Sequence, residues 1–231
     1  MTNLTIRILK KPELNLVKNL QQIVTANLEN QELLAPSPDD LITSSINYPN
    51  SIAGIFCEGR LIAYSLFYIP GKSPDNLGHD IGIPENELDR VVHFEESCVH
   101  PDYRGKKLLS VLMSFLTQIA IKQHNIKHIC ATVSPYNYPS LKAVFQSSGM
   151  LARKLVTKYG GRKRYIFHRN LELFPVPENK KVKVLSKDLD LQQKLFNQGY
   201  VAYNVVKGDK NSNEKIFHIL FDKFQWVTSQ V

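Results

Sequence analysis

The chain has 231 residues, of which 43% are hydrophobic and 22% charged, with a formal net charge of +8 at pH 7. These proportions are typical of a soluble globular protein with a sizeable core. The longest charge-free apolar stretch (108–121) is too short to span a bilayer. The first fifteen residues contain no apolar signal region. Three cysteines, Cys57, Cys98 and Cys130, are far apart and lack CxxC spacing, which predicts free thiols in a reducing, cytoplasmic compartment and no metal site.

The first third of the chain predicts two helices between strands. Residues 5–9 alternate like a strand, and Pro12 suits the first turn of a helix that runs to about residue 28. Ser37 and Pro38 start a second, short helix with acids in its first turn. Residues 51–69 are typical of two strands joined at Glu58-Gly59. The polar stretch 72–89 is predicted to be a long loop, and loops of that length are often functional.

The middle of the chain predicts strands at 91–99 and 128–133 with a helix between them that ends near Asn125. A helix over 139–148, terminated by Gly149, and a hairpin over 151–171 with a Gly160-Gly161 turn follow. The element order predicts a mixed α/β sheet with helices on both faces.

The composition changes after Leu173. FPVPENKK (174–181) indicates a linker, 186–199 a capped helix, and 200–206 with 215–221 a closing hairpin. We therefore divide the chain into a main domain, 1–173, and a C-terminal extension, 174–231. The extension is too small to carry a core alone, so we expect it to pack on the main domain or on a second subunit, as in a homodimer.

A basic turn stands where the helix after strand 91–99 begins. Gly105 lets the backbone approach a ligand, and Arg104, Lys106 and Lys107 add positive charge. The first N–H groups of a helix and its dipole form an anion site, and a diphosphate would suit it. These residues alone predict a strand, a phosphate-binding turn and a helix.

Two motifs in this order resemble those of a known family. VHPDYRGKKLLSVLM is similar to the acetyl-CoA-binding motif of the GNAT superfamily of N-acyltransferases, whose core reads Arg/Gln-x-x-Gly-x-Gly/Ala after a Val-x-Pro strand end. VSPYNYPSLKAVFQSSGM resembles the family's second motif, and YGGRKRYIFHRNL the hairpin that ends many such domains. The resemblance covers about residues 1–173. It implies a mixed, mostly antiparallel central sheet flanked by helices, followed here by a small α+β C-terminal extension.

The resemblance implies that acetyl-CoA binds in a splay between strands 91–99 and 128–133. The backbone of Cys98 and Val99 would pair with the pantetheine arm, and Asn137 would bind the cofactor from its loop. The full set of implied cofactor-binding residues is Cys98, Val99, Arg104, Gly105, Lys106, Lys107, Leu108, Leu109, Asn137 and Phe145. Lys107 and Leu109 replace usual glycines, and Phe145 replaces the tyrosine that commonly serves as general acid. Tyr136, Tyr138 or water could replace it.

Acyl transfer to an amine needs a neutral amine, so a base helps. Period-two alternation places His93, Glu95, Ser97 and Val99 on one face of strand 91–99. The family commonly has its base on this strand, at positions that match His93 or Glu95, and we take these two as the candidate catalytic residues. The competing interpretation is that they are solvated polar residues at a strand end.

The sequence and the resemblance together predict an N-acyltransferase that transfers an acetyl group from acetyl-CoA to the amine of a small molecule or peptide. The alternative is a non-catalytic acyl-CoA-binding regulator with a degenerate site, motivated by Phe145 and the replaced glycines. Nucleic-acid binding through the basic run 153–169 is disfavoured because few base-stacking aromatics beyond Tyr159 and Tyr165 are interleaved with its cations. The acceptor pocket is expected between the first two helices, the 72–89 loop and the 153–171 hairpin. The many cations mildly favour an acceptor with a carboxylate or phosphate beside its amine.

Overall fold

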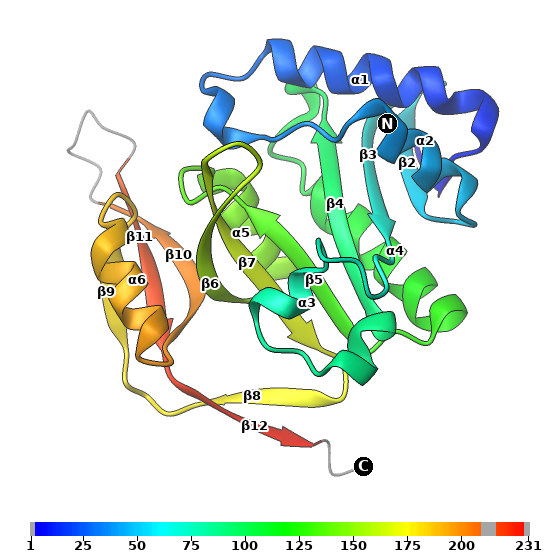
Figure 1. The fold of residues 1–231 in the computed structure, drawn as a ribbon. Coiled ribbons are helices and arrows are strands. Elements are labelled where there is room, and N and C mark those ends of the chain that lie inside the picture. The colour runs from blue at the N-terminus through cyan, green and yellow to red at the C-terminus, as the bar shows by residue number, and fades with distance from the viewer. Residues whose placement is uncertain (1–2, 209–215, 229–231) are drawn as a thin grey trace.

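The computed structural model describes residues 3–208 and 216–228. In this part of the chain, ten strands form one sheet in the order β1-β2-β3-β4-β5-β7-β6-β10-β11-β9 (Figure 1). The main-domain strands are β1 (Leu4–Ile8), β2 (Ile52–Cys57), β3 (Arg60–Tyr68), β4 (Val91–Val99), β5 (His128–Val133), β6 (Leu151–Lys158) and β7 (Arg162–Asn170). β4 and β5 run parallel, and the other paired neighbours of the described sheet run antiparallel, which confirms the predicted fold class.

Helices cover both faces of this sheet. They are α1 (Leu14–Ala26), α2 (Asp39–Asn47), α3 (Leu77–Asp80), α4 (Leu108–His124) and α5 (Tyr138–Ser147), with short 3₁₀ helices η1 (Lys11–Glu13), η2 (Gln31–Leu33), η3 (Glu85–Arg90) and η4 (Pro101–Tyr103). The stretch 72–89 is therefore not a plain loop: α3 and η3 lie within it. α2 begins at Asp39 with Pro38 at the N-cap, so Ser37 is not the cap that the sequence predicts.

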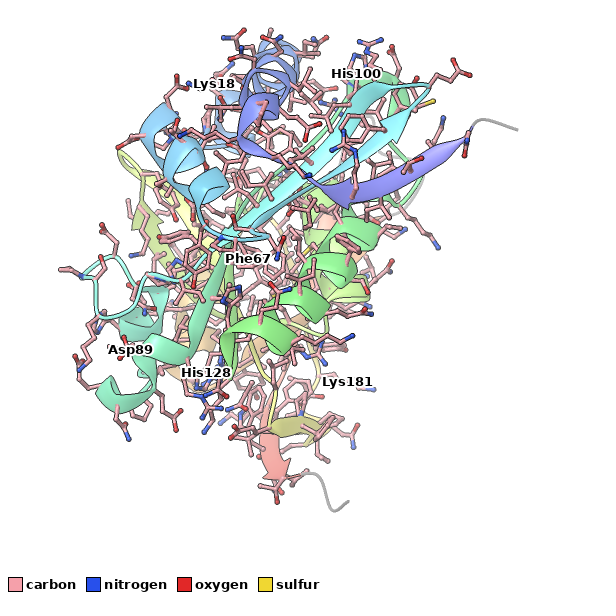
Figure 2. The ribbon with its side chains drawn as sticks, turned by 90° about the vertical axis from the view of Figure 1, so that its right-hand side faces the viewer. Lys18, Phe67, Asp89, His100, His128 and Lys181 are labelled. Atoms are coloured by element: carbon pink, nitrogen blue, oxygen red, sulfur yellow. The ribbon has the colours of Figure 1, made fainter. Side chains whose placement is uncertain are left out.

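Two apolar clusters hold these helices to the sheet. One lies on the α1–α2 side and includes Val17, Leu20 and Ile42. The larger one lies under α4 and α5 and includes Leu112 and Leu116, both of which are fully buried. β4 and β5 lie between these two clusters, so both faces of this strand pair are covered by helices. Figure 2 shows the two ends of this strand pair: His128 begins β5, and His100 follows the end of β4 at the opposite end of the molecule.

The C-terminal extension continues the same sheet. Its elements are β8 (Leu173–Pro177), β9 (Val182–Leu185), α6 (Leu189–Asn197), β10 (Val201–Lys207), β11 (Phe217–Asp222) and β12 (Phe224–Thr228). β10 pairs with β6 at Ala202↔Ala152, and Leu195, Phe196 and Phe221 belong to the same core cluster as α4 and α5. The extension therefore packs on the rest of its own chain, which is one of the two expected placements. The predicted hairpin is confirmed as β10 and β11, and its turn lies mostly outside the described residues.

The predicted linker is wrong at its start. Residues 173–177 form β8, which pairs with β12 in a separate two-stranded sheet. Pro175 and Pro177 are two residues apart and therefore occupy equivalent positions of the β8–β12 ladder. A strand tolerates proline where no ladder N–H is required.

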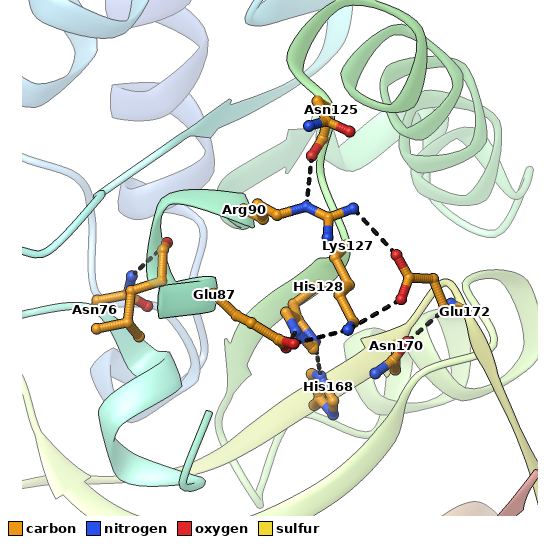
Figure 3. Close-up of polar contacts among 10 residues, drawn as sticks. Asn76, Glu87, Arg90, Asn125, Lys127, His128, His168, Asn170 and Glu172 are labelled. Carbon is orange, nitrogen blue, oxygen red and sulfur yellow. Dashed lines mark hydrogen bonds and ion pairs between the residues drawn. The ribbon is translucent and has the colours of Figure 1, made fainter. Parts of the chain in front are cut away.

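A polar cluster ties η3 to the start of β5 (Figure 3). Glu87 bonds Lys127 Nζ and His128 Nε2, each at 2.8 Å, and Glu172 bonds Lys127 at 3.0 Å and Arg90 at 3.1 Å. The cluster fixes the segment between β3 and β4 at the end of the sheet far from His100.

In the part of the chain that the structure describes, no helix is long and apolar enough to cross a membrane. The three cysteines are free, as predicted, and all are buried. The described residues contain no His, Cys, Asp and Glu group that could hold a metal ion.

Candidate active site

β4 and β5 separate partway along their length. They pair from Val91↔His128 to Phe94↔Ala131, and no further pair joins them in the described sheet. From Glu95 onward, the edge of β4 that faces β5 therefore has backbone N–H and C=O groups available for another extended chain. The predicted splay between these two strands is confirmed.

A β-bulge in β4 changes which side chains share a face. The register with β3 shifts by one residue after Phe94, so Glu95 is the extra residue. Phe94 packs in the core under α4, whereas Glu96 contacts α1 and Cys98 belongs to the cluster on the α1 side. The extra residue reverses the alternation at Glu95, so the prediction that His93 shares one face with residues 95, 97 and 99 is wrong for His93.

A cavity of about 90 Å³ lies at the splay. Leu109 and Met113 of α4 line it from one face of the sheet, and residues 33–35, between α1 and α2, line it as well. Tyr159 and Arg164 come from the β6–β7 hairpin. Of the three walls predicted for the acceptor pocket, the hairpin lines this cavity, the first two helices contribute only the segment that connects them, and residues 72–89 do not line it.

Glu95 lines this cavity and is partly buried. Burial raises the pKa of its carboxyl group to about 7, and the negative charges of Glu96 and Asp75 add to the effect. A carboxyl group that titrates near neutral pH is well suited to accept a proton from an amine or a water molecule. The bulge therefore presents a proton acceptor at the point where the two strands part.

His93 is buried below the cavity wall and does not line it. The backbone N–H of Leu77 donates to Nε2 at 3.1 Å, Asn76 Oδ1 lies 3.3 Å from the same nitrogen, and Nδ1 lies 3.2 Å from the Tyr68 hydroxyl. Burial lowers the pKa of His93 to about 3, so the ring is neutral at pH 7. This geometry suits a residue that positions Tyr68 and α3 better than one that moves protons.

Glu96 is buried and anchors the layer on the α1 side. Its carboxylate accepts hydrogen bonds from Gln21 Nε2 at 3.1 and 3.2 Å, from the Ser37 backbone N–H at 2.6 Å and from the Tyr64 hydroxyl. Adjacent glutamates thus have different surroundings: Glu95 faces the cavity, and Glu96 is enclosed by donors.

Cys98 has a buried thiol that does not line the cavity. Burial, with the charge of Glu96, raises the pKa of this thiol, which disfavours a thiolate nucleophile. The backbone of Cys98 and Val99 lies on the part of β4 beyond its last pair with β5, where the predicted pairing with a pantetheine arm remains a prediction.

The turn before α4 has the backbone of an anion site. Gly105 has φ 77° and Lys107 has φ 59°, both in the left-handed region. Lys107 is the N-cap of α4 and makes no side-chain capping bond, and the N–H groups at the start of a helix form an anion site. Arg104 and Lys106 are exposed beside them. Glycine adopts a left-handed backbone without strain, which explains why the GNAT motif usually has a glycine where Lys107 stands.

The remaining predicted cofactor residues differ in exposure to the cavity. Leu109 lines it, whereas Leu108 is buried in the core. Phe145 is also in the core, edge-on to Phe167 with ring centroids 4.9 Å apart. Phenylalanine has no ionisable group, so residue 145 cannot act as a general acid.

Asn137 lines the cavity and caps α5. Its Oδ1 accepts from the Ser140 N–H at 3.1 Å, and its Nδ2 donates to the Leu33 carbonyl at 3.1 Å. The residue thus joins the start of α5 to the segment between α1 and α2, and it forms part of the cavity wall.

Tyr159 was not predicted as a site residue. It has φ 51° at the Tyr-Gly-Gly turn, lines the cavity, and accepts a hydrogen bond from Thr132 Oγ1 at 3.4 Å. Burial raises its pKa to about 12, and the charge of Glu95 adds to this rise. A neutral phenol thus lies near Glu95, whereas Tyr138, one of the proposed replacements for the missing acid, packs edge-on against Phe217 with ring centroids 5.2 Å apart.

Arg164 is the second residue that the sequence did not single out. Its side chain lines the cavity although the residue is 2% exposed. Nη1 donates to the Lys163 carbonyl at 2.8 Å, and Nη2 has no hydrogen-bond partner among the described residues. The only signal in the sequence was membership of the basic run 153–169, which does not reveal the one side chain that turns inward.

Comparisons with known proteins agree with this architecture. Residues 20–149 match the family model described as the acetyltransferase (GNAT) family. The structure is similar to an N-acetyltransferase of Staphylococcus aureus Mu50 (16% identity, 74% of this chain and 100% of that chain, TM-score 0.55). It is also similar to a Salmonella typhimurium protein solved with acetyl-CoA (18%, 73% and 94%, 0.54) and to a Drosophila melanogaster polyamine N-acetyltransferase (12%, 73% and 100%, 0.54). At these identities the likeness concerns the fold. No sequence among the curated proteins matches the chain.

Proposed function

From the premise that this chain belongs to the acetyltransferase (GNAT) family, we propose that it transfers an acetyl group from acetyl-CoA to an amine. The observation that carries the proposal is Glu95, a carboxyl group with a pKa of about 7 at the mouth of the β4–β5 splay. The family supplies the reaction class. The acceptor and the roles of individual residues are our own assignment.

The residues present fit acetyl-CoA. The left-handed turn at Gly105 and Lys107 and the start of α4 would hold the diphosphate, with Arg104, Lys106 and Lys107 as cations. The unpaired edge of β4 at Cys98 and Val99 would pair with the amide groups of the pantetheine arm. Bound there, acetyl-CoA supplies the acetyl group as a thioester.

Glu95 and Tyr159 then perform the proton transfers. Glu95 takes one proton from the ammonium group of the acceptor, directly or through water, which leaves a nucleophilic amine. As the C–N bond forms and the C–S bond breaks, the nitrogen loses its second proton to water. Tyr159 donates a proton to the departing sulfur and regains one from solvent. Burial is the main cause of the raised Tyr159 pKa and the charge of Glu95 adds to it, so protonation of Glu95 makes Tyr159 a somewhat stronger acid for the second transfer.

A screen with labelled acetyl-CoA and an amine library tests this function. We expect label transfer to at least one amine by the wild type and a strong loss in Glu95→Gln and Tyr159→Phe. Tyr203→Phe is the matched control, because Tyr203 lies in the extension and its ring packs against Phe224. Tight acetyl-CoA binding without transfer to any amine would contradict the enzyme and favour the acyl-CoA-binding regulator, for which the phenylalanine at position 145 is the motivating observation.

A further inference from the structure

Arg164 is a buried cation whose guanidinium group is only partly hydrogen-bonded. It is 2% exposed, and Nη2 has no hydrogen-bond partner among the described residues. Glu32, Arg162 and Tyr159 are the charged or titratable groups that act on it, but no ion pair joins its guanidinium to a described carboxylate. Buried cations are normally paired or fully hydrogen-bonded, because an unsatisfied buried charge is costly.

The other cations of the basic run have local partners. Lys158 pairs with Asp80 at 2.8 Å, and Lys154 donates to the Asp80 carbonyl at 2.8 Å. Arg153 lies over the Trp226 ring at 5.1 Å, and Arg169 donates to the Ser148 carbonyl at 2.9 Å. None of the seven basic residues of this run except Arg164 lines the cavity at the splay. The other cations of the run therefore make contacts within the fold, and Arg164 is the member that lines the cavity.

Glu95, Tyr159 and Arg164 are arranged around the same cavity. Tyr159 lies at the turn of the β6–β7 hairpin and Arg164 on β7, and the charges of Glu95 and Arg164 both act on the Tyr159 phenol. An acceptor that reaches Glu95 with its amine would therefore bring its neighbouring atoms close to Arg164.

We propose that the acceptor is an amino acid, an amine that carries a carboxylate a few bonds away, and that Arg164 binds this carboxylate while Glu95 faces the amine. The proposal rests on the proposed function and names its substrate class. A guanidinium recognises a carboxylate by charge-assisted hydrogen bonds. The same buried cation repels a second ammonium group, so polyamines are disfavoured.

Binding of reaction products tests the inference without turnover. The protein–CoA complex is titrated by calorimetry with N-acetyl derivatives of the twenty common amino acids and with the matching primary carboxamides. We expect at least one acid to bind tenfold or more tightly than its carboxamide. Arg164→Gln should abolish this difference, and Arg164→Lys should restore part of it. Lys163→Gln, which changes a neighbouring cation outside the cavity, should keep the difference within twofold of the wild type. CoA affinity and far-UV circular dichroism of each variant show whether it folds.

Equal binding of acids and carboxamides by the wild type overturns the inference, as does a preference for acids that survives in Arg164→Gln. Absence of binding of any acid at millimolar concentration also overturns it. The proposed function is judged separately, by acetyl transfer to amines of any charge. Transfer to uncharged or polycationic amines alone would preserve the function and refute the substrate class.

Discussion

At the scale of single residues, two adjacent glutamates have different surroundings, and we assign catalysis to one of them and stability to the other. Glu95 is the extra residue of the bulge and faces the cavity, whereas Glu96 accepts hydrogen bonds from Gln21, Ser37 and Tyr64. Strict alternation along β4 separates Glu95 from Glu96, as the structure has them, but it wrongly places His93 on the face of Glu95 because it takes no account of the bulge. Arg164 could not be found for a similar reason: the sequence shows a run of cations, and burial selects one of them.

Glu95 should control the pH dependence of acetyl transfer. Its pKa is raised to about 7, and the unprotonated form is the base. kcat/KM should therefore rise about tenfold per pH unit below pH 7 and level off above it. Glu95→Gln should lower kcat by roughly 100-fold or more and remove this inflection. An unchanged profile in the variant, measured from pH 5 to pH 9, would exclude Glu95 as the base.

Glu96 should control stability. Glu96→Ala leaves the buried donors of Gln21, Ser37 and Tyr64 without their acceptor, so we expect it to lower the free energy of unfolding by about 3 kcal/mol or more. Urea unfolding measures the loss, with Glu95→Ala as the matched control. A smaller loss in Glu96→Ala than in Glu95→Ala would show that the two roles have been exchanged.

At the scale of elements, the turn–helix unit and the paired strands were predictable, whereas the segment from β3 to β4 was not. The turn at Arg104–Lys107 was readable because glycine and cations before an apolar helix have a direct physical meaning. Residues 72–89 look like a loop because they are polar and rich in glycine and proline. Their α3 and η3 depend on distant partners: His93 accepts from the start of α3, and Lys127 and His128 hold η3 through Glu87.

The Glu87 cluster should make this segment sensitive to acid. Hydrogen bonds from Lys127 and His128 lower the pKa of Glu87. Its stabilising contribution is therefore complete above the ordinary carboxyl pKa and is lost as the pH falls through the lowered value. Glu87→Gln should reduce the free energy of unfolding by about 1 kcal/mol at pH 7 and by much less at pH 3. Glu85→Gln, an exposed change in the same 3₁₀ helix, is the control; an equal loss at both pH values would rule out the linkage.

At the scale of the whole molecule, the extension shares the core of the acetyltransferase fold. The fold class, the splay and the closing hairpin follow from the sequence, since each depends on local pattern or on the resemblance. The pairing of β10 with β6 and of β8 with β12 does not, because non-local partners leave no mark on either strand alone. The boundary at residue 173 remains a prediction, although Phe196 and Phe221 pack within the common core.

This shared core predicts one cooperative unfolding transition. Trp226, the single tryptophan, lies in β12 near Arg153 of β6, so its fluorescence reports on the extension while far-UV circular dichroism reports on the whole chain. We expect coincident urea midpoints for the two signals. Phe221→Ala, which empties a fully buried site, should lower both midpoints together, at a cost of about 3–5 kcal/mol. Separate midpoints would show that the extension is an independent unit.

The most direct test of the central claim is calorimetric titration of the full chain with acetyl-CoA, for the wild type, Arg104→Ala and Glu95→Gln. The account predicts micromolar binding by the wild type, several-fold weaker binding by Arg104→Ala, and unchanged binding by Glu95→Gln, which lacks only the proposed base. No binding at millimolar acetyl-CoA would contradict both the acetyltransferase and the acyl-CoA-binding regulator.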